Sequence, residues 1–261
     1  MILITGANGF VGQRLMEMVK GAVAAPSLRN ATQEDIKRIV EESGAETIIH
    51  TAAISDMGVC ESDPEASFLA NVLIPLWIAQ ASSGRKLICF SSDQVYSGSK
   101  EDGSYSEEMA APGNVYSSHK LEMEQRVLDV LPDAVMLRAE WMYDVRSPKP
   151  NYILNILRAT DRVAFSSGQY RGVTYLREVA ENMEKVISLP GGAYNFGSET
   201  TQSMYEITKQ LAALLGKNLV VEDAPPRHNL WMNCGKAKNY GVCFSDVLIG
   251  LTRCLRDYEI I

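Results

Sequence analysis

The sequence predicts an α/β protein built on a doubly wound parallel sheet, and three observations carry this prediction. Short apolar runs alternate with amphipathic helical segments through the first half of the 261-residue chain. A glycine-rich turn follows the first apolar run. Polar residues follow later runs, at the strand ends where such a sheet binds its ligand. Because parallel strands need crossover connections, we expect helices on both faces of the sheet.

The first half contains five expected strands and four expected helices. The β-branched run at 46–50 is typical of a strand, and Thr32 is a helix N-cap candidate followed by acidic residues. Asp63 and Pro64 open another helix, with proline near its first position. The strands are expected at 1–5, 23–25, 46–50, 86–91 and 134–137, and the helices at 10–19, 32–43, 63–82 and 115–131.

The pattern becomes less regular after Trp141. Helices are expected at 151–159, 176–188, 204–215 and 244–258, and strands at 162–165, 193–196 and 219–221. We therefore predict a dinucleotide-binding domain over residues 1–143 and a smaller substrate-binding lobe over residues 144–261. This lobe is expected to be interleaved with the first domain, with some of its segments returning to the main sheet.

Composition excludes several classes of protein. The formal net charge of -7 argues against nucleic-acid binding, which usually needs a basic patch. The five cysteines form no C-x-x-C pair and the three histidines do not cluster, so we expect neither a disulfide framework nor a metal site. The chain shows no signal peptide and no apolar run of roughly 20 residues, which predicts a cytoplasmic protein without a membrane partner.

The glycine-rich turn has the form TGANGFVG at residues 5–12 and stands between the first strand and the first helix. Gly6 permits the tight turn, Gly9 lets the backbone approach a pyrophosphate, and Gly12 lets helix and strand pack closely. The helix N-terminus would offer free N–H groups to the phosphates. The motif predicts a nicotinamide dinucleotide site with contacts from Gly6, Asn8, Gly9, Phe10, Val11 and Gly12.

The end of the second strand indicates which nicotinamide cofactor is bound. A carboxylate there would bind the ribose 2′-hydroxyl of NAD and repel the 2′-phosphate of NADP. The sequence has no carboxylate at residues 24–29, and Ser27 and Arg29 could hold a phosphate. NADP(H) is therefore favoured over NAD(H).

A candidate catalytic set follows the fourth strand. Tyr116 and Lys120 stand one helical turn apart, so both fall on one helix face. A neighbouring ammonium lowers the pKa of a phenol that is otherwise a poor acid–base group at neutral pH. Ser92 and Asp93 come directly after the fourth strand, where a hydroxyl could hydrogen-bond a substrate carbonyl beside Tyr116.

These motifs together resemble the extended short-chain dehydrogenase/reductases, and most of all the dTDP-4-dehydrorhamnose reductase group of nucleotide-sugar 4-keto reductases. HTAA at residues 50–53 resembles the family's alanine-rich strand end, and SSDQVYSG at 91–98 resembles its S-T-D-x-V-F-x-G. PGNVYSSHK at 112–120 resembles P-x-N-x-Y-G-x-x-K, and RAEWMY at 138–143 resembles R-x-S-W-x-Y. QYRGVT at 169–174 resembles Q-x-G-x-P-T.

The resemblance implies a hydride transfer from NADPH to C4 of a keto sugar. Tyr116 would protonate the alkoxide, Lys120 would tune Tyr116 and hold the cofactor ribose, and Ser92 would orient the carbonyl. The resemblance adds Ala52, Ala53 and Asn71 as cofactor-binding candidates, and Asp93, Glu61, Trp141 and Arg227 as substrate-binding candidates.

Three departures from the family pattern leave the substrate open. Met57–Gly58 replace a V-D pair, Glu140 replaces the serine before Trp141, and Arg227–His228 replace R-P. Two other functions therefore remain as alternatives: a nucleotide-sugar epimerase or dehydratase, and a cofactor-binding regulatory subunit without catalysis. For a dehydratase, Gln94 beside Asp93 stands where a paired carboxylate is expected. A homodimer is also left open.

Overall fold

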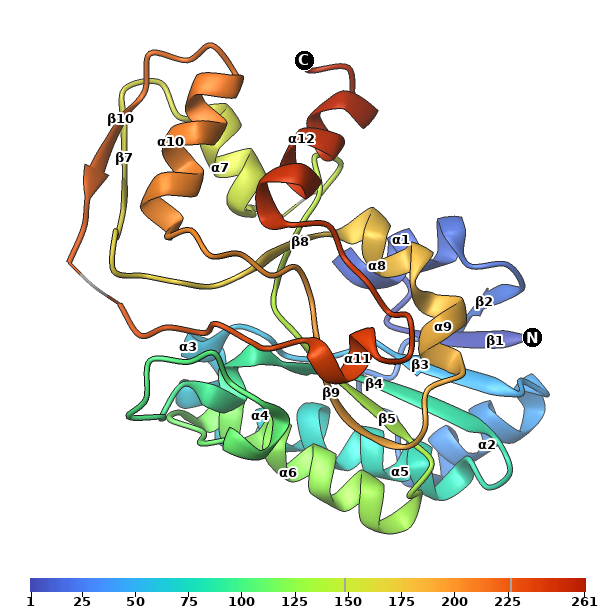
Figure 1. The fold of residues 1–261 in the computed structure, drawn as a ribbon. Coiled ribbons are helices and arrows are strands. Elements are labelled where there is room, and N and C mark those ends of the chain that lie inside the picture. The colour runs from blue at the N-terminus through green and yellow to red at the C-terminus, as the bar shows by residue number, and fades with distance from the viewer. Residues whose placement is uncertain (148, 226) are drawn as a thin grey trace.

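The computed structural model describes residues 1–147, 149–225 and 227–261. Its centre is a six-stranded sheet with strand order β2-β1-β3-β4-β5-β9, in which every neighbouring pair is parallel (Figure 1). This confirms the predicted doubly wound fold. The strands are β1 (Ile2–Thr5), β2 (Ala22–Ala24), β3 (Thr47–His50), β4 (Lys86–Ser92), β5 (Val135–Ala139) and β9 (Gly192–Phe196).

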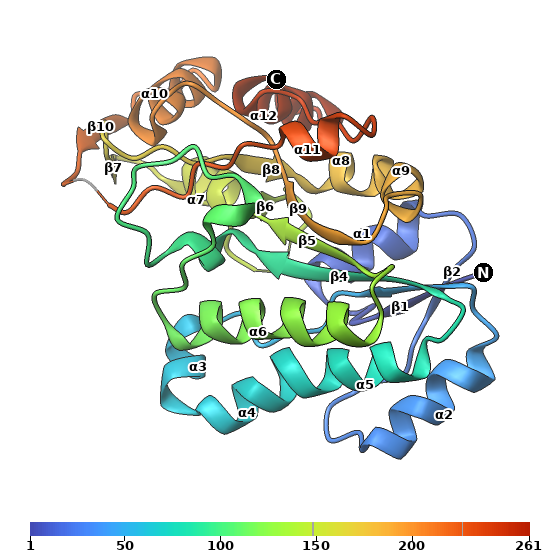
Figure 2. The ribbon, with the colours of Figure 1, turned by 60° about the horizontal axis from the view of Figure 1, so that its bottom comes forward.

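Helices cover both faces of this sheet. Figure 2 shows α2 (Gln33–Ser43), α5 (Ile74–Ala81) and α6 (Val115–Val130) side by side on one face. The opposite face carries α1 (Phe10–Met18), α8 (Leu176–Glu181) and α9 (Met183–Ile187). Each face has its own apolar core, because strands buried on both sides point alternate side chains to opposite layers.

Local sequence signals set several element ends. Thr32 caps α2 through a reciprocal capping box with Asp35. The Asp63 side chain accepts a hydrogen bond from the Ala66 N–H at the start of α4 (Pro64–Phe68). The single helix expected at 63–82 is instead α4, a π-helical turn η1 (Leu69–Leu73) and α5. The helix expected at 176–188 likewise divides into α8 and α9, at Asn182.

A third apolar core lies in the upper lobe of Figure 1. It is formed mainly by α7 (Tyr152–Arg158), α10 (Met204–Leu214) and α12 (Val247–Asp257), with β8 (Val173–Tyr175). Two small parallel sheets complete this part of the chain. They pair β7 (Arg162–Phe165) with β10 (Val220–Asp223), and β6 (Trp141–Tyr143) with β8.

The remaining elements are short. The sequence pattern does not predict β6, β8, α3 (Met57–Ser62) or α11 (Gly235–Lys238). Two 3₁₀ turns, η2 (Asp93–Tyr96) and η3 (Glu107–Met109), lie between β4 and α6. None of the helices in the described ranges has the length and apolarity needed to span a bilayer. The same ranges hold no group of three or more His, Cys, Asp or Glu side chains arranged to bind a metal.

Candidate active site

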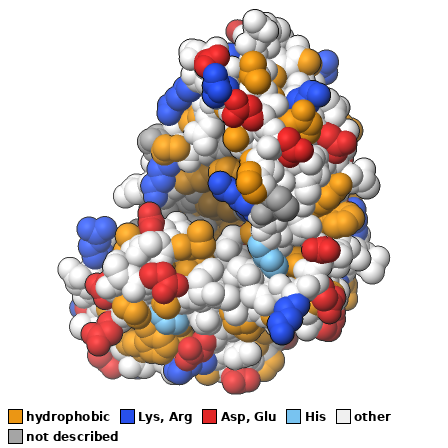
Figure 3. All heavy atoms as spheres, turned by 90° about the vertical axis from the view of Figure 1, so that its left-hand side faces the viewer, with side chains coloured by type: hydrophobic (Ala, Val, Ile, Leu, Met, Phe, Trp, Pro, Cys, Tyr) orange, Lys and Arg blue, Asp and Glu red, His pale blue; other side chains and the backbone are white. Residues whose placement is uncertain are grey.

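A cavity of about 940 Å³ lies between the main sheet and the upper lobe. Its lining combines the β1–α1 turn, the carboxyl ends of β2, β3 and β4, and the start of α6 with residues from the second half of the chain. Figure 3 shows it as a deep hollow in the molecular surface. The cavity therefore occupies the crevice at the carboxyl ends of the strands, where doubly wound sheets bind ligands.

The glycine turn forms one end of this cavity. Gly6 has a φ of +69°, and a Cβ there would lie 2.7 Å from the Ala52 backbone nitrogen. A Cβ at Gly12 would overlap the Gly6 carbonyl oxygen. Gly9 is the N-cap of α1 and provides no side-chain hydrogen bond, so the first N–H groups of α1 stay available. This backbone fits a pyrophosphate, because it offers N–H donors without side-chain obstruction.

The end of β2 supplies the polar residues expected beside the adenosine ribose. Ser27 and Arg29 both line the cavity, and the Ser27 hydroxyl accepts a hydrogen bond from the Arg29 N–H at 3.3 Å. Both residues are exposed, and within the described chain no carboxylate forms an ion pair with Arg29. The arrangement can take a 2′-phosphate through a hydroxyl and a guanidinium.

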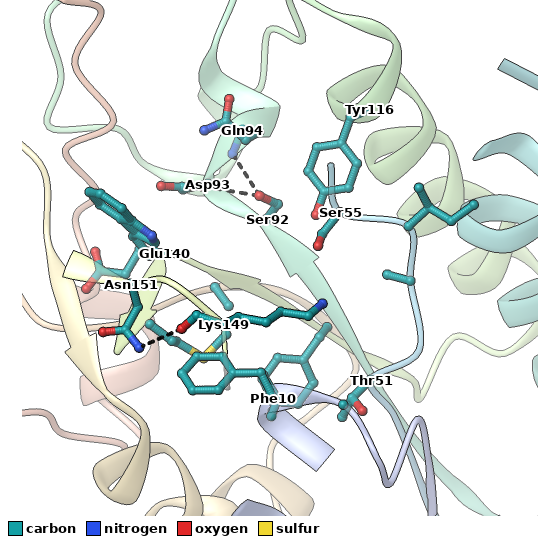
Figure 4. A pocket seen from close by; sticks show the side chains of 18 of the residues that line it. Phe10, Thr51, Ser55, Ser92, Asp93, Gln94, Tyr116, Glu140, Lys149 and Asn151 are labelled. Carbon is teal, nitrogen blue, oxygen red and sulfur yellow. Dashed lines mark hydrogen bonds between the residues drawn. The ribbon is translucent and has the colours of Figure 1, made fainter. Parts of the chain in front are cut away.

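Figure 4 shows Tyr116 and Ser92 in the same cavity, and Lys120 is a third residue of its lining. The capping box of Asn114 with Ser117 starts α6 at Val115, so Tyr116 lies in the first turn. Burial raises the pKa of Tyr116 well above its usual value, and a hydrogen bond with the neighbouring Ser92 hydroxyl partly opposes this rise. The phenol is therefore protonated at neutral pH and can act as a proton donor.

Lys120 lies behind Tyr116, with its ammonium 6.0 Å from the centroid of the Tyr116 ring. Its Nζ donates a hydrogen bond to the Phe90 carbonyl oxygen at 2.8 Å. Burial lowers the pKa of Lys120 to about 8, because the charged ammonium loses its hydration. Burial and the nearby Lys120 charge lower the pKa of His50 to about 3, which leaves this histidine neutral.

The opposite end of the cavity contains Asp93, from η2, and charged side chains from segments outside the helices and strands. Asp93 accepts a hydrogen bond from Arg171 Nη2 at 2.7 Å, and the Arg171 guanidinium lies 5.2 Å from the Trp141 ring centroid. The buried Glu140 carboxyl accepts hydrogen bonds from the Thr174 hydroxyl and from the Ser198 N–H. Burial raises the pKa of Glu140 to about 8, so this carboxyl is mostly protonated at neutral pH.

Most of the candidate residues line the cavity, and three do not. Gly12 acts through packing, as described above. Asn71 is buried and holds the loop after β3, because its amide hydrogen-bonds both the N–H and the carbonyl of Ile54. Glu61 accepts a hydrogen bond from the Val115 N–H at 2.9 Å and so binds the first turn of α6. The candidates that line the cavity are Gly6, Asn8, Gly9, Phe10, Val11, Ser27, Arg29, Ala52, Ala53, Ser92, Asp93, Tyr116, Lys120, Trp141 and Arg227.

Sequence reasoning missed several lining residues from the second half of the chain. Arg171, Lys149 and Asn151 all line the cavity, and Glu140 was noticed only as a departure from the family pattern. Arg171 and Lys149 lie outside helices and strands, so no periodicity marked them. The one available signal was that Arg171 stands where the Q-x-G-x-P-T pattern has glycine.

The fold and the glycine turn define a Rossmann-type dinucleotide-binding protein. The model of the RmlD substrate binding domain family matches residues 1–225, and the chain belongs to this family. The resemblance found in the sequence is thereby confirmed.

Similar proteins include named reductases. The chain is 27% identical over 239 residues to the probable low-salt glycan biosynthesis reductase Agl14 of Haloferax volcanii, covering 82% of this chain and 79% of the relative. It is 29% identical over 240 residues to methionine adenosyltransferase 2 subunit beta of Xenopus tropicalis, covering 80% and 70%. The crystal structure of dTDP-4-dehydrorhamnose reductase from Bacillus anthracis in complex with NADP superposes with a TM-score of 0.84 at 21% identity, covering 98% and 97% of the two chains.

Proposed function

We propose that the protein is an NADPH-dependent reductase that converts the keto group of a 4-keto nucleotide sugar into an alcohol. The observation that carries this proposal is the meeting of Ser92, Tyr116 and Lys120 in the cavity that also contains the glycine turn. The names of relatives such as the Haloferax volcanii reductase support the reaction class. The 4-keto sugar and the roles of the three side chains come from the family resemblance.

The proposed cofactor fits the residues at its end of the cavity. The turn at Gly6 and Gly9 would hold the pyrophosphate, and Ser27 with Arg29 would hold the 2′-phosphate of NADPH. The Bacillus anthracis structure with NADP supports this choice. When bound, the reduced nicotinamide supplies the hydride that reduces the carbonyl carbon.

The side chains of this protein would perform the proton transfer. The Ser92 hydroxyl would donate a hydrogen bond to the keto oxygen and hold it beside Tyr116. The Tyr116 phenol would give its proton to the oxygen as the alkoxide forms, which leaves a phenolate. Its raised pKa makes Tyr116 a weak proton donor. The Lys120 ammonium would offset this by stabilising the phenolate that forms.

A regulatory subunit is the second candidate function, because the chain is similar to methionine adenosyltransferase 2 subunit beta. This alternative predicts cofactor binding without turnover. The polar set of Ser92, Tyr116 and Lys120 favours the reductase, since a binding subunit does not need a buried proton donor beside a buried ammonium.

The test is NADPH oxidation, followed at about 340 nm, with dTDP-4-dehydro-6-deoxy-L-mannose as substrate. We expect Tyr116→Phe to lower kcat by about a hundredfold or more, in the range of lost general acid catalysis, while NADPH binding is retained. Tyr240→Phe is the matched control, because Tyr240 is exposed and lies outside the cavity. Tight NADPH binding without turnover of any 4-keto nucleotide sugar tested would refute the reductase and favour the regulatory subunit.

A further inference from the structure

Arg171 stands out among the cavity residues that the proposed reaction does not use. It lines the cavity and lies between Gln169, another lining residue, and β8. Its backbone is held by an isolated parallel bridge to Leu230. Its guanidinium lies over the Trp141 ring, so both the backbone and the side chain are fixed in place.

The Arg171 guanidinium has unused hydrogen-bonding capacity. Nη2 donates to Asp93, whereas the buried Nε has no partner among the described residues. The side chain is only 14% exposed. A buried donor without a partner is costly, and native structures rarely leave one unless a water or a ligand satisfies it. Because Nε has almost no accessible surface, a ligand oxygen would reach this guanidinium at Nη1, which makes no hydrogen bond with the described residues.

The position of Arg171 indicates which part of a ligand it meets. Asp93 directly follows Ser92, and its negative charge contributes to the raised pKa of Tyr116. Because Arg171 donates a hydrogen bond to Asp93, Arg171 lies at the catalytic end of the cavity. The glycine turn, at the other end, is the part suited to a cofactor diphosphate. The sugar ring of a substrate would therefore lie nearer to Arg171 than the cofactor phosphates would.

Glu140 holds the segment that carries Arg171. Its carboxyl packs against Gly172 and Gly197 so closely that a Cβ at either glycine would overlap it. The Thr174 hydroxyl, three residues after Arg171, donates a hydrogen bond to Glu140 Oε1. The Ser198 N–H donates to the same oxygen at 2.7 Å. Glu140 therefore links the end of β5 to Thr174 in β8 and to Ser198, two residues after β9.

Both residues are departures from the patterns that the rest of the chain resembles. Glu140 stands in place of serine, and Arg171 stands in place of glycine. The two departures lie in one structural unit, since Glu140 contacts the residue that follows Arg171. Glu140 and Arg171 therefore form one local arrangement at the substrate end of the cavity.

We propose that Arg171 is a specificity-determining residue that donates a hydrogen bond to an oxygen substituent of the substrate's sugar, and that Glu140 is the positioning residue that holds Arg171 in place. The inference rests on the proposed function, because it assumes a nucleotide-sugar substrate. The diphosphate of that substrate could accept the same hydrogen bond. The test therefore compares binding of a nucleotide sugar with binding of its free nucleoside diphosphate.

The test is isothermal titration calorimetry of the full chain in the presence of NADP⁺. The probes are dTDP-glucose, UDP-glucose and GDP-glucose, each compared with its free nucleoside diphosphate. We expect Arg171→Gly to weaken binding of the preferred nucleotide sugar by about tenfold or more, with little change for the free diphosphate. Arg171→Lys should recover part of the loss, and Arg162→Gly, an exposed change outside the cavity, should have no effect.

Each other result overturns a defined part of the inference. An equal loss for the nucleotide sugar and the diphosphate would assign Arg171 to the phosphates. If Arg171→Gly binds the nucleotide sugar as tightly as the unmodified protein, Arg171 makes no contact with the ligand, and the proposed function is unaffected. Absence of nucleotide-sugar binding to the unmodified protein would refute the proposed function and the inference together. The affinity of each variant for NADPH, measured at the other end of the cavity, shows that the variant is folded.

The role of Glu140 is tested by two substitutions at one position. Glu140→Gln keeps the shape and one acceptor oxygen, so we expect binding of the nucleotide sugar to remain within about threefold of the unmodified protein. Glu140→Ser removes the contact with Thr174 and should reproduce the loss seen in Arg171→Gly. The double variant Glu140→Ser/Arg171→Gly should then lose no more than either single variant. Fully additive losses, or equal losses in Glu140→Gln and Glu140→Ser, would overturn the positioning role.

Discussion

Replacing Glu140 by glutamine tests the energetics of the substrate end of the cavity directly. The Glu140 carboxyl is only 4% exposed and its Oε1 accepts hydrogen bonds from Thr174 and Ser198. Burial raises its pKa from 4.5 to about 8, the hydrogen bond from Thr174 opposes the rise, and the nearby Asp93 charge adds to it. Glutamine keeps the shape and the acceptor oxygen but cannot ionise.

The sign and size of the effect follow from proton linkage. Between about pH 4.5 and pH 8 the folded protein keeps a proton on Glu140 that the unfolded chain has released, so its free energy of unfolding falls as pH rises. At about 1.4 kcal/mol per pH unit, the loss reaches about 4 kcal/mol between about pH 5 and pH 9. Glu140→Gln lacks this loss and should be the more stable protein at the higher pH.

Urea denaturation of both proteins at about pH 5 and about pH 9 measures this difference. Other groups that titrate are present in both proteins, so their contributions cancel when the two unfolding free energies are subtracted. Glu222→Gln is the control for loss of a carboxylate at a partly exposed position outside the cavity. A stability difference between Glu140→Gln and the unmodified protein that does not change with pH would refute the reasoning.

Four further predictions follow from other contacts. Lys120→Met should abolish turnover, because the proposed partner of Tyr116 is lost. Burial lowers the pKa of Lys120 to about 8, so the same substitution should raise the free energy of unfolding at neutral pH by about 3 kcal/mol in urea denaturation. A loss of stability would contradict this prediction. For the same reason, turnover of the unmodified protein should fall as pH rises through about 8, where Lys120 loses its charge. Gly12→Ala should weaken NADPH binding by about tenfold or more in a fluorescence titration, because its Cβ would overlap the Gly6 carbonyl; normal affinity would show that the turn can adjust. Glu124→Gln leaves the buried Arg138 guanidinium without its counter-ion. The free energy of unfolding, measured by urea denaturation, should fall by about 3 to 5 kcal/mol. A fall below about 1 kcal/mol would show that Arg138 has another partner for its charge.

The parts of the fold that the sequence predicted depend on short-range rules. The spacing of Gly6, Gly9 and Gly12 indicated a strand-to-helix turn because each glycine answers a local steric demand. Thr32 indicated a helix start because its side chain reaches a backbone N–H only three residues away. The strands of the main sheet were found for a similar reason, since burial on both faces makes them continuous apolar runs.

The parts that the sequence did not predict depend on contacts between distant segments. The expected helix at 63–82 is interrupted by the π-helical turn that contains Asn71, whose amide binds Ile54 in the loop after β3. Periodicity cannot show such a turn, because the apolar spacing continues across it. The resemblance placed Glu61 near the substrate, whereas the structure shows its carboxylate at the Val115 N–H. Glu61 therefore reaches the site only through α6.

The two ends of the cavity differ in how far the resemblance to known reductases can be extended. At the cofactor end, the glycine turn, Ser27 and Arg29 follow from local sequence and meet the requirements of one ligand type. At the substrate end, Arg171 and Glu140 come from separate segments and are joined only by the fold. The patterns that the chain resembles have serine and glycine where this chain has Glu140 and Arg171. The sugar therefore has to be identified with Arg171 and Glu140 in place, and the binding comparison with nucleotide sugars has to precede any assignment from relatives.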